Sequence, residues 1–291
     1  MKKAILILLG ISLALIVGGF AVFAASGFSI PGNGITFSTA RYYSSPVLHE
    51  QKADAAQCSS VNLSLVNCRL TVKLYTGNQI SLSYEEQYKG QWDYSLAAGE
   101  MKLEPHHEGW LQSVTDGLSF LRNGSLSRTS DVTLYVPKGC ALDYRINDVS
   151  GRGSLAGITT GDLDINCVSS DYTLQDLTAN GGCTLKGVSG SYTLEKFNAQ
   201  SLKLSHMVSG SCEMQGCDVA SVDATGFVSS RLTITDTGSP DDYTVKYSLV
   251  SGGVSFDGDR FSGSGRLGNT DAKKEITFDG VSSNLNVNFS K

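Results

Sequence analysis

Short runs of alternating apolar and polar residues make up much of the chain after residue 57, and this period of two is typical of half-buried β-strands. Three such runs follow one another closely: Val61, Leu63 and Leu65; Leu70, Val72 and Leu74; and Ile80, Leu82 and Tyr84. A Gly77-Asn78 turn separates the last two runs. This spacing predicts an antiparallel β-meander over residues 58–140.

One segment inside the expected meander has a different period. Trp110, Val114, Leu118 and Leu121 are spaced by four, four and three residues, which places them on one face of a helix. We therefore expect a short helical insert near residues 108–124. It either covers the open end of the β-core or presents an apolar patch to lipid or to a partner.

From residue 141 to residue 291 the apolar pattern repeats about every twenty residues. A Val-Ser-Gly or Val-Ser-Ser motif begins at Val149, Val168, Val188, Val208 and Val228, so the steps are 19 or 20 residues long. The residue six positions after each valine is always apolar: Leu155, Leu174, Leu194, Met214 and Ile234. One repeat cannot bury its apolar face alone, whereas stacked copies form a continuous core. The period therefore predicts a stack of β-coils.

The polar positions of the repeat agree with stacking. Serine follows each of the five valines, and the residues five positions after the valines are Ser154, Thr173, Thr193, Glu213 and Thr233. In stacked strands such residues lie about 4.8 Å apart, where like charges would repel one another but hydroxyl groups can form hydrogen bonds. A mostly neutral column is therefore what a stack requires.

The repeat loosens after Val228. The motif recurs at Val250 and Val281, and we expect the residues between them to form a loop or hairpin inserted before the last coil. Residues 284–289 (NLNVNF) alternate regularly, which predicts a closing strand.

The beginning of the chain has no such alternation. Residues 4–25 carry no charge and would form about 33 Å of helix, enough to cross a hydrocarbon core about 30 Å thick. Lys2 and Lys3 precede this segment and the next positive charge is Arg41, which favours a cytoplasmic N-terminus and an extracytoplasmic remainder. We expect a membrane anchor over residues 1–27 and a juxtamembrane stalk over residues 28–57. A signal peptide cut after Ala24 is the alternative, and the bulk of the chain is exported in either case.

Composition and charge narrow the class of partner. The chain has 291 residues, 41% of them hydrophobic, and a net charge of −5, so it can bury a large core. Its 23 basic residues are dispersed and form no stripe that would bind nucleic-acid phosphates. The seven cysteines are Cys58, Cys68, Cys140, Cys167, Cys183, Cys212 and Cys217. An odd number leaves at least one thiol unpaired, and the spacing is not that of a zinc site; Cys58 and Cys68 either bridge two strands or stay unpaired.

No group of residues indicates a cofactor or a catalytic centre. Gly263, Gly265 and Gly268 match G-x-G-x-x-G, but no helix follows them to hold a pyrophosphate, so we expect a glycine-rich turn. The histidines are His49, His106, His107 and His206. The adjacent pair lacks a third ligand at a spacing that would bind a metal, and no histidine lies near an identifiable acid and nucleophile. We predict no catalytic, cofactor-binding or metal-binding residues.

Parallel β-solenoids can also cleave acidic polysaccharides, which would need charged groups gathered on one face. Asp162, Asp164, Asp171 and Asp176 are close in sequence. We expect their strand and turn positions to scatter them, so a carbohydrate-active enzyme is a remote alternative.

These motifs together carry a family resemblance. The stretch Leu134–Gly139 (LYVPKG), the serial VSG-type repeats and the closing segment Gly263–Ser283 resemble the bacterial "putative adhesin" family, whose β-strand-repeat domains are also called toastrack domains. The resemblance spans residues 50–291. It implies a right-handed single-stranded β-solenoid tethered to the cell envelope, often associated with envelope-stress systems, and no catalytic residues. The acidic residue usual after the family's VSG motif is mostly absent, since Arg152, Ser191 and Ser211 occupy that place.

The sequence thus predicts an all-β solenoid behind a single transmembrane helix, on the outer side of a bacterial cell membrane. The expected function is non-catalytic binding or sensing at the envelope, with an envelope component or a membrane protein as partner. A structural protein that self-associates is the alternative, because an open coil end would expose unpaired strand edges.

Overall fold

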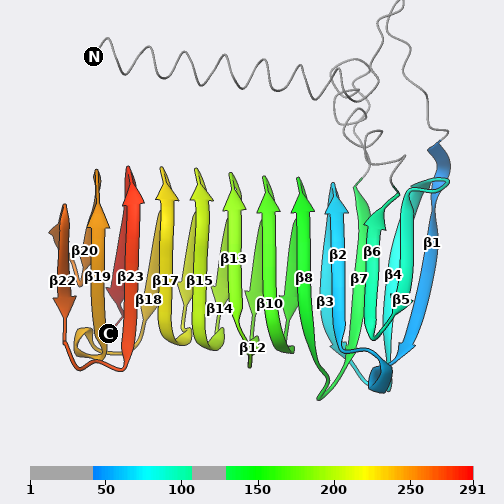
Figure 1. The fold of residues 1–291 in the computed structure, drawn as a ribbon, viewed down its shortest axis with the longest axis horizontal. Coiled ribbons are helices and arrows are strands. Elements are labelled where there is room, and N and C mark those ends of the chain that lie inside the picture. The colour runs from blue at the N-terminus through cyan, green and yellow to red at the C-terminus, as the bar shows by residue number, and fades with distance from the viewer. Residues whose placement is uncertain (1–41, 107–128, 291) are drawn as a thin grey trace, which may run out of the picture. The chain divides into compact units, whose positions relative to one another are not determined.

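A computed structural model describes residues 42–106 and 129–290, and these residues form one all-β unit. Its strands belong to two facing sheets, with the apolar core between them (Figure 1). Two single-turn helices, η1 (Ala55–Gln57) and η2 (Pro240–Asp242), are the only helices in the described ranges.

Sheet A contains, in spatial order, β1 (Tyr42–Asp54), β4 (Gln79–Tyr88), β7 (Ser130–Pro137), β3 (Cys68–Tyr75), β9 (Arg152–Ala156), β11 (Asp171–Gln175), β14 (Ser191–Glu195), β16 (Ser211–Gln215), β18 (Arg231–Asp236), β24 (Ser283–Phe289), β20 (Gly252–Phe256) and β21 (Asp259–Phe261). Sheet B contains β22 (Ser264–Gly268), β19 (Tyr243–Leu249), β23 (Lys274–Val281), β17 (Asp218–Val228), β15 (Asn198–Val208), β12 (Thr178–Ala179) with β13 (Cys183–Val188), β10 (Thr159–Val168), β8 (Ala141–Val149), β2 (Ser60–Val66), β6 (Glu100–Pro105) and β5 (Trp92–Ala97).

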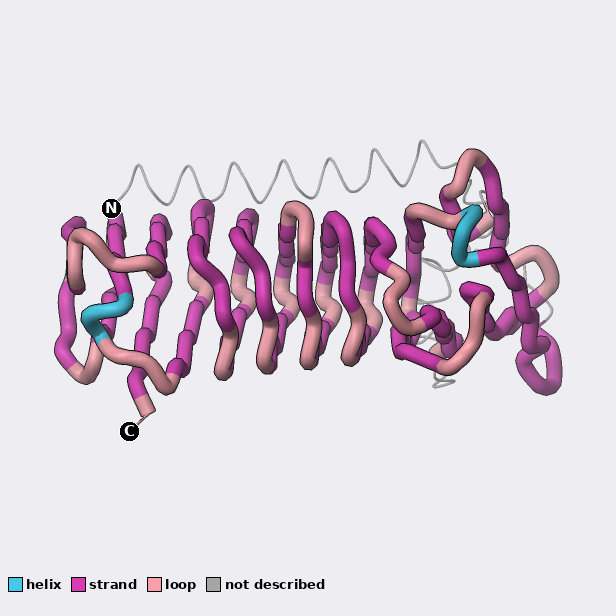
Figure 2. Tube along the Cα trace, turned by 90° about the horizontal axis from the view of Figure 1, so that it is seen from below, coloured by secondary structure: helices cyan, strands magenta, loops and turns pink. Residues whose placement is uncertain are grey.

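Each twenty-residue repeat forms one coil, with one strand in sheet A and one strand, or the pair β12 and β13, in sheet B, and Figure 2 shows the coils stacked one after another. Neighbouring coils pair in parallel and in register, so that Leu174 lies opposite Leu155 on one side and Leu194 on the other. The apolar column predicted six residues after the valines is confirmed, because all its members are buried. Stacking is thus the physical reason for the repeat.

The serine of each motif turns the chain from sheet B to sheet A. Ser150, Ser169, Ser189, Ser209 and Ser229 have φ between 52° and 61°, the left-handed region that few non-glycine residues adopt. Their backbone N–H groups donate to the carbonyl oxygen of a motif valine in the next coil, at 2.7–2.9 Å. This inter-coil hydrogen bond holds the corner in its strained conformation.

The expected antiparallel meander is wrong for its first two strands. β2 pairs in parallel with β6 and β8 in sheet B, whereas β3 pairs in parallel with β7 and β9 in sheet A. They form one more coil of the stack, because Asn67 makes the same corner as the serines: its φ is 53° and its N–H donates to Val149 O at 2.9 Å. Antiparallel pairing occurs instead at β4, with β1 and β7, and at β5, with β6.

β-Structure also begins before residue 58, inside the segment expected to be a stalk. β1 pairs with β4 in antiparallel fashion, for example Glu50 with Ser83 and Ala53 with Ile80. Ala53 is its buried residue, whereas Val47 and Leu48 are exposed, so the strand shows little hydrophobic alternation in the sequence.

The coil that comes last in the sequence does not come last in space. β23 lies between β17 and β19, and β24 lies between β18 and β20, as the red strands of Figure 1 show. The expected order, with the Val281 coil at the end of the stack, is therefore wrong. The chain leaves a gap one coil wide after β18, and its final residues fill that gap. The expected insert, β21 and β22, pairs antiparallel with β20 and β19 and closes the end of the stack.

Contacts at both ends hold this C-terminal coil (residues 274–289). Where it begins, Lys274 Nζ lies 2.9 Å from Asp236 Oδ2 on β18. Where it ends, the Phe289 ring packs edge-on against Tyr243 and Phe256, with centroid distances of 5.4 and 5.6 Å.

Two predictions fall outside the described residues: the N-terminal anchor and the helical insert near residues 108–124. Within residues 42–106 and 129–290, no helix is long and apolar enough to span a bilayer. All seven cysteines lie in these ranges and are free thiols, so the possible bridge between Cys58 and Cys68 is not formed. The right-handed winding of the coils stays a prediction.

Candidate functional site

The outward side chains of sheet A form in-register columns across the coils. The predicted Ser/Thr column is confirmed, since Ser154, Thr173, Thr193, Glu213 and Thr233 lie opposite one another in successive strands. A parallel column, two residues earlier along each strand, contains Arg152, Asp171, Ser191, Ser211 and Arg231. Past β18 the two columns continue into the C-terminal coil, at Asn286 and Asn284 respectively.

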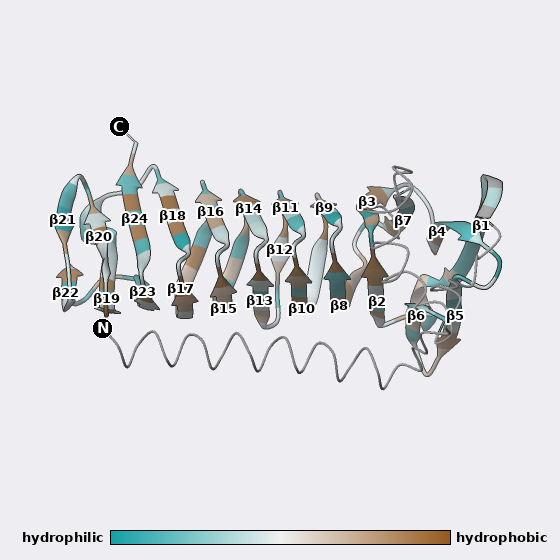
Figure 3. Ribbon diagram, turned by 90° about the horizontal axis from the view of Figure 1, so that it is seen from above, coloured by the Kyte–Doolittle hydropathy of each residue, from teal (hydrophilic) through white to brown (hydrophobic). Residues whose placement is uncertain are grey.

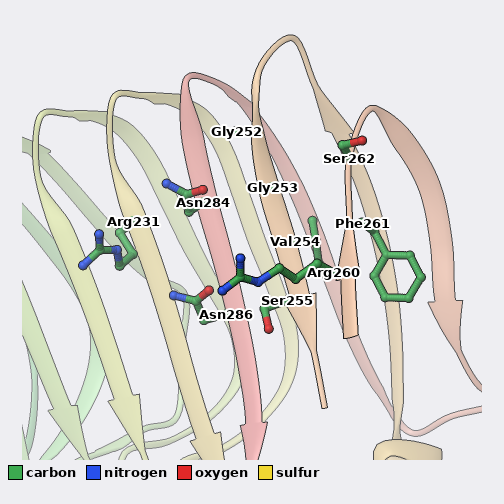
Figure 4. A pocket seen from close by; sticks show the side chains of 10 residues that line it. All are labelled: Arg231, Gly252, Gly253, Val254, Ser255, Arg260, Phe261, Ser262, Asn284 and Asn286. Carbon is green, nitrogen blue, oxygen red and sulfur yellow. The ribbon is translucent and has the colours of Figure 1, made fainter. Parts of the chain in front are cut away.

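Sheet A is hollowed where these columns cross β18, β24, β20 and β21. This C-terminal hollow has a volume of about 600 Å³, and its lining includes Arg231, Gly253, Ser255, Arg260, Asn284 and Asn286. Figure 4 shows the Arg260 side chain extending across Ser255 toward Asn286, with Arg231 on the far side of Asn284. Three separate parts of the sequence therefore meet at one place.

Two consecutive glycines line the hollow. Gly252 has φ of 102°, and a Cβ there would lie 1.9 Å from Ser283 O, so only glycine fits. Gly253 faces outward opposite Asn284, where the column would otherwise continue with a side chain. A Cβ on Gly253 would meet Phe261 O at 3.4 Å, an ordinary contact, so this second glycine leaves open space rather than relieving strain.

The charged side chains of the hollow form no ion pair that would stabilise the fold. Among the described residues, neither Arg231 nor Arg260 forms an ion pair or a side-chain hydrogen bond with another residue. At the other end of sheet A, by contrast, Arg69 pairs with Asp131 at 3.4 Å. On a chain with a net charge of −5, two unpaired arginines beside two asparagines form a local cationic surface.

A second hollow, of about 440 Å³, lies on sheet B and is mainly acidic. Its carboxylates support the neighbouring backbone: Asp143 Oδ1 accepts from Asp162 N–H at 2.8 Å, and Asp162 Oδ1 accepts from Gly182 N–H at 2.7 Å. Asp164 lies 3.4 Å from Lys186 Nζ. These carboxylates therefore stabilise the coils and are not available as free ligand-binding groups.

This arrangement corrects part of the expectation that four aspartates are scattered. Asp162 and Asp164 both line the sheet B hollow. Asp171 lies on β11 in sheet A, and Asp176 follows that strand at a corner with φ of 49°. Because strand β10 presents alternate residues to one face, Asp162 and Asp164 come together while the other two do not.

One carboxyl group is buried in the core. Asp148 is 1% exposed and occupies the position where the next coils have Cys167 and Gly187; Figure 3 shows the end of β8 coloured hydrophilic between the hydrophobic ends of β2 and β10. Burial raises the pKa of Asp148 to about 6, although the Tyr172 hydroxyl donates to its Oδ2 at 2.9 Å. The sequence pattern does not distinguish this buried carboxyl group, since Asp148 directly precedes a repeat motif.

The histidines and the glycine motif have structural roles where they are described. His49 bonds to Glu86 at 3.0 Å and His106 to Asp93 at 2.8 Å, while His206 has φ of 56° inside β15; the fourth histidine lies outside the described residues. Gly263, Gly265 and Gly268 belong to β22 and to the turns at its ends, so a short strand accompanies the expected turn. In the described ranges, no three His, Cys, Asp or Glu residues are placed to hold a metal ion.

The coils, their corners and the parallel register coincide with a known family model. The model described as Toastrack DUF4097 matches residues 60–255. The chain belongs to this family. The match runs from β2 to β20, so the C-terminal coil, with Asn284 and Asn286, and the strand carrying Arg260 lie beyond it.

The solved structures that this toastrack protein matches share little sequence with it. A Bacteroides fragilis protein described as a "putative adhesin" is 10% identical, with 84% of this chain and 97% of that chain covered and a TM-score of 0.38. A Parabacteroides distasonis protein described as a "putative lipid binding protein" is 12% identical, with 86% and 96% covered and a TM-score of 0.36. A Clostridium sporogenes "putative cell adhesion protein" is 10% identical, with 84% and 100% covered and a TM-score of 0.31. A comparison with curated proteins finds no match.

Proposed function

We propose that this toastrack protein is a non-catalytic binding module of the bacterial cell envelope, exported and held at the membrane by its apolar residues 4–25. Membership of the family supports the architecture. The uncharged segment, preceded by two lysines, supports the anchor and its orientation. Binding to an envelope component then either attaches the cell or senses the state of the envelope.

The observation that carries the binding role is the C-terminal hollow. Its arginine and asparagine side chains come from strands paired on both sides, β18 and β24, and from the closing hairpin of β20 and β21. Strand pairing fixes the backbone positions of these side chains before a ligand arrives, which lowers part of the entropic cost of binding. The carboxylates of the sheet B hollow already have partners in the protein, because Asp143 and Asp162 accept from backbone N–H groups and Asp164 lies 3.4 Å from Lys186 Nζ.

The structure favours binding over self-assembly. The edge strands beside the hollow are short, with three residues in β21 and five in β22, and β1 at the opposite edge of sheet A contains Pro46. Short strands and proline discourage pairing between edges. Self-association therefore stays the alternative. It was expected from an open parallel coil at the end of the stack, and the antiparallel strands β21 and β22 cover that end.

Two measurements test the proposal in the native cell. Protease added to intact spheroplasts should digest the chain after residue 26 and leave an N-terminal membrane fragment, whereas a cytoplasmic protein would be protected. The purified full chain should also sediment with envelope fragments from which the native protein has been removed. Failure to sediment with wall and membrane fractions alike would refute the binding role, and protection from protease would refute the location.

A further inference from the structure

We propose that the C-terminal hollow is a binding site for an acidic glycan, a polymer that carries both hydroxyl groups and carboxylate or phosphate groups. This inference rests on the proposed binding function and names its ligand class. Three features of the hollow carry it: unpaired cationic groups, neutral amide and hydroxyl groups between them, and open space left by a glycine.

The cationic groups of the hollow suit an anionic ligand. Arg231 and Arg260 approach the hollow from β18 and β21, on either side of the C-terminal coil. Within the described part of the chain, no carboxylate forms an ion pair with either. Arginine presents a planar set of donors that matches carboxylate and phosphate oxygens, and such charge-assisted bonds are stronger than neutral ones.

The groups between the arginines suit hydroxyls. Asn284 and Asn286 project from β24, and Ser255 on β20 lies directly opposite Asn286 in the register. Amide and hydroxyl groups both donate and accept hydrogen bonds, as a sugar hydroxyl does. A small inorganic anion would use the arginines and leave this row unused, whereas a polyhydroxylated anion engages both sets.

The shape of the hollow suits part of a chain molecule. Its volume of about 600 Å³ lies within the range of about 300–1,000 Å³ typical of small-molecule sites. It lies on the outer face of sheet A, so a polymer can enter and leave on both sides. Gly253 provides the space, since any larger residue there would project into the hollow from the middle of its floor.

The test is direct binding of defined probes to the full chain, purified in a non-ionic detergent, by calorimetry. The probes are oligogalacturonate for sugar carboxylates, poly(glycerol phosphate) for phosphates, and dextran as the neutral control. We expect binding to at least one acidic polymer, weakened by added salt, and no binding to dextran. The comparison of the two acidic probes distinguishes a carboxylate ligand from a phosphate ligand.

Three variants locate the site. Arg260→Gln should weaken binding about tenfold or more, because it removes a charge-assisted hydrogen bond, and Gly253→Val should block the hollow without changing any charge. Arg152→Gln is the matched control: it alters an exposed arginine in the same column of sheet A as Arg231, on a coil without the hollow. It should leave binding unchanged. Equal losses in the control and in Arg260→Gln would overturn the assignment, as would unchanged binding in Gly253→Val with wild-type thermal stability.

The outcomes separate this inference from the proposed function. Sedimentation with envelope fragments, without binding to either acidic polymer, would refute the acidic-glycan site and leave the binding module standing. Binding to vesicles of an anionic lipid, but to neither polymer, would likewise refute it in favour of a membrane surface. Absence of all binding would refute both.

Discussion

Replacing Asp148 by asparagine should change how the stability of this protein depends on pH. The carboxyl group lies in the core at the end of β8, beside the Tyr172 hydroxyl, and its Oδ1 has no hydrogen-bond partner in the described structure. Burial raises its pKa from 3.8 to about 6. Above that pH the folded state must hold a poorly solvated negative charge.

The sign and size of the effect follow from linkage. Since the pKa of Asp148 is higher in the folded chain, the folded state binds a proton more tightly, and this group favours folding more as the pH falls from about 6 to about 4. The full difference amounts to about 3 kcal/mol, because one pH unit corresponds to about 1.4 kcal/mol. Asp148→Asn removes this dependence. Whatever constant cost the buried amide adds, the stability of the variant relative to wild type should rise by about 2 kcal/mol between about pH 4.5 and about pH 7.5.

Urea denaturation of both proteins at several pH values measures this difference. Other carboxyl groups titrate equally in the two proteins and cancel in the comparison. Asp279→Asn, at an exposed position on β23, is the control and should follow the wild-type curve. A stability difference between Asp148→Asn and wild type that stays constant with pH would show that Asp148 is not the buried ionisable group inferred here.

Two other substitutions test the coil contacts by the same denaturation assay. Lys274→Ala should lower the free energy of unfolding by about 1–3 kcal/mol, because it leaves the mostly buried Asp236 carboxylate without its cation. Lys246→Ala, in a more exposed pair, should lower it by less than about 0.5 kcal/mol. Equal losses in the two variants would refute a stabilising role for the Lys274–Asp236 pair at the C-terminal coil. Gly190→Ala should lower the free energy of unfolding by about 1–3 kcal/mol, because its Cβ would lie 2.3 Å from the Ser170 carbonyl oxygen. In the control Gly182→Ala the new Cβ meets no atom closer than 3.6 Å, so its stability should be nearly that of wild type. Wild-type stability in Gly190→Ala would mean that the coils can separate at this corner.

The repeat could be predicted from sequence because stacking constrains the same positions in every coil. Leu155, Leu174 and Leu194 are buried as the period required. The first coil was missed because Asn67, rather than serine, forms its corner, although asparagine also tolerates positive φ. Strand β1 was missed because its pairing with β4 depends on backbone hydrogen bonds at a mostly polar edge.

The order of the last coils could not be predicted from the pattern. Val250 and Val281 begin equivalent motifs, and hydrophobic alternation determines which face a residue occupies but not which strand lies next to it. In the structure Val228 pairs with Val281. Contacts of the C-terminal coil with its neighbours, such as Lys274 with Asp236 and Phe227 with Phe278, distinguish the observed order from the sequential one, and they join residues far apart in the chain.

The same insertion explains why the candidate site was missed and gives it a further property. The coil at β24 places Asn284 and Asn286 between Arg231 and Arg260, so the hollow exists only when the final residues of the chain have filled the gap beside β18. A ligand that binds this assembled hollow stabilises the inserted coil. The stabilisation amounts to about 2.7 kcal/mol when the free ligand concentration is about a hundred times its dissociation constant. The doublet Gly252-Gly253 is the one sequence feature that indicates the site, and it can be interpreted only together with the side chains that the inserted coil places beside it.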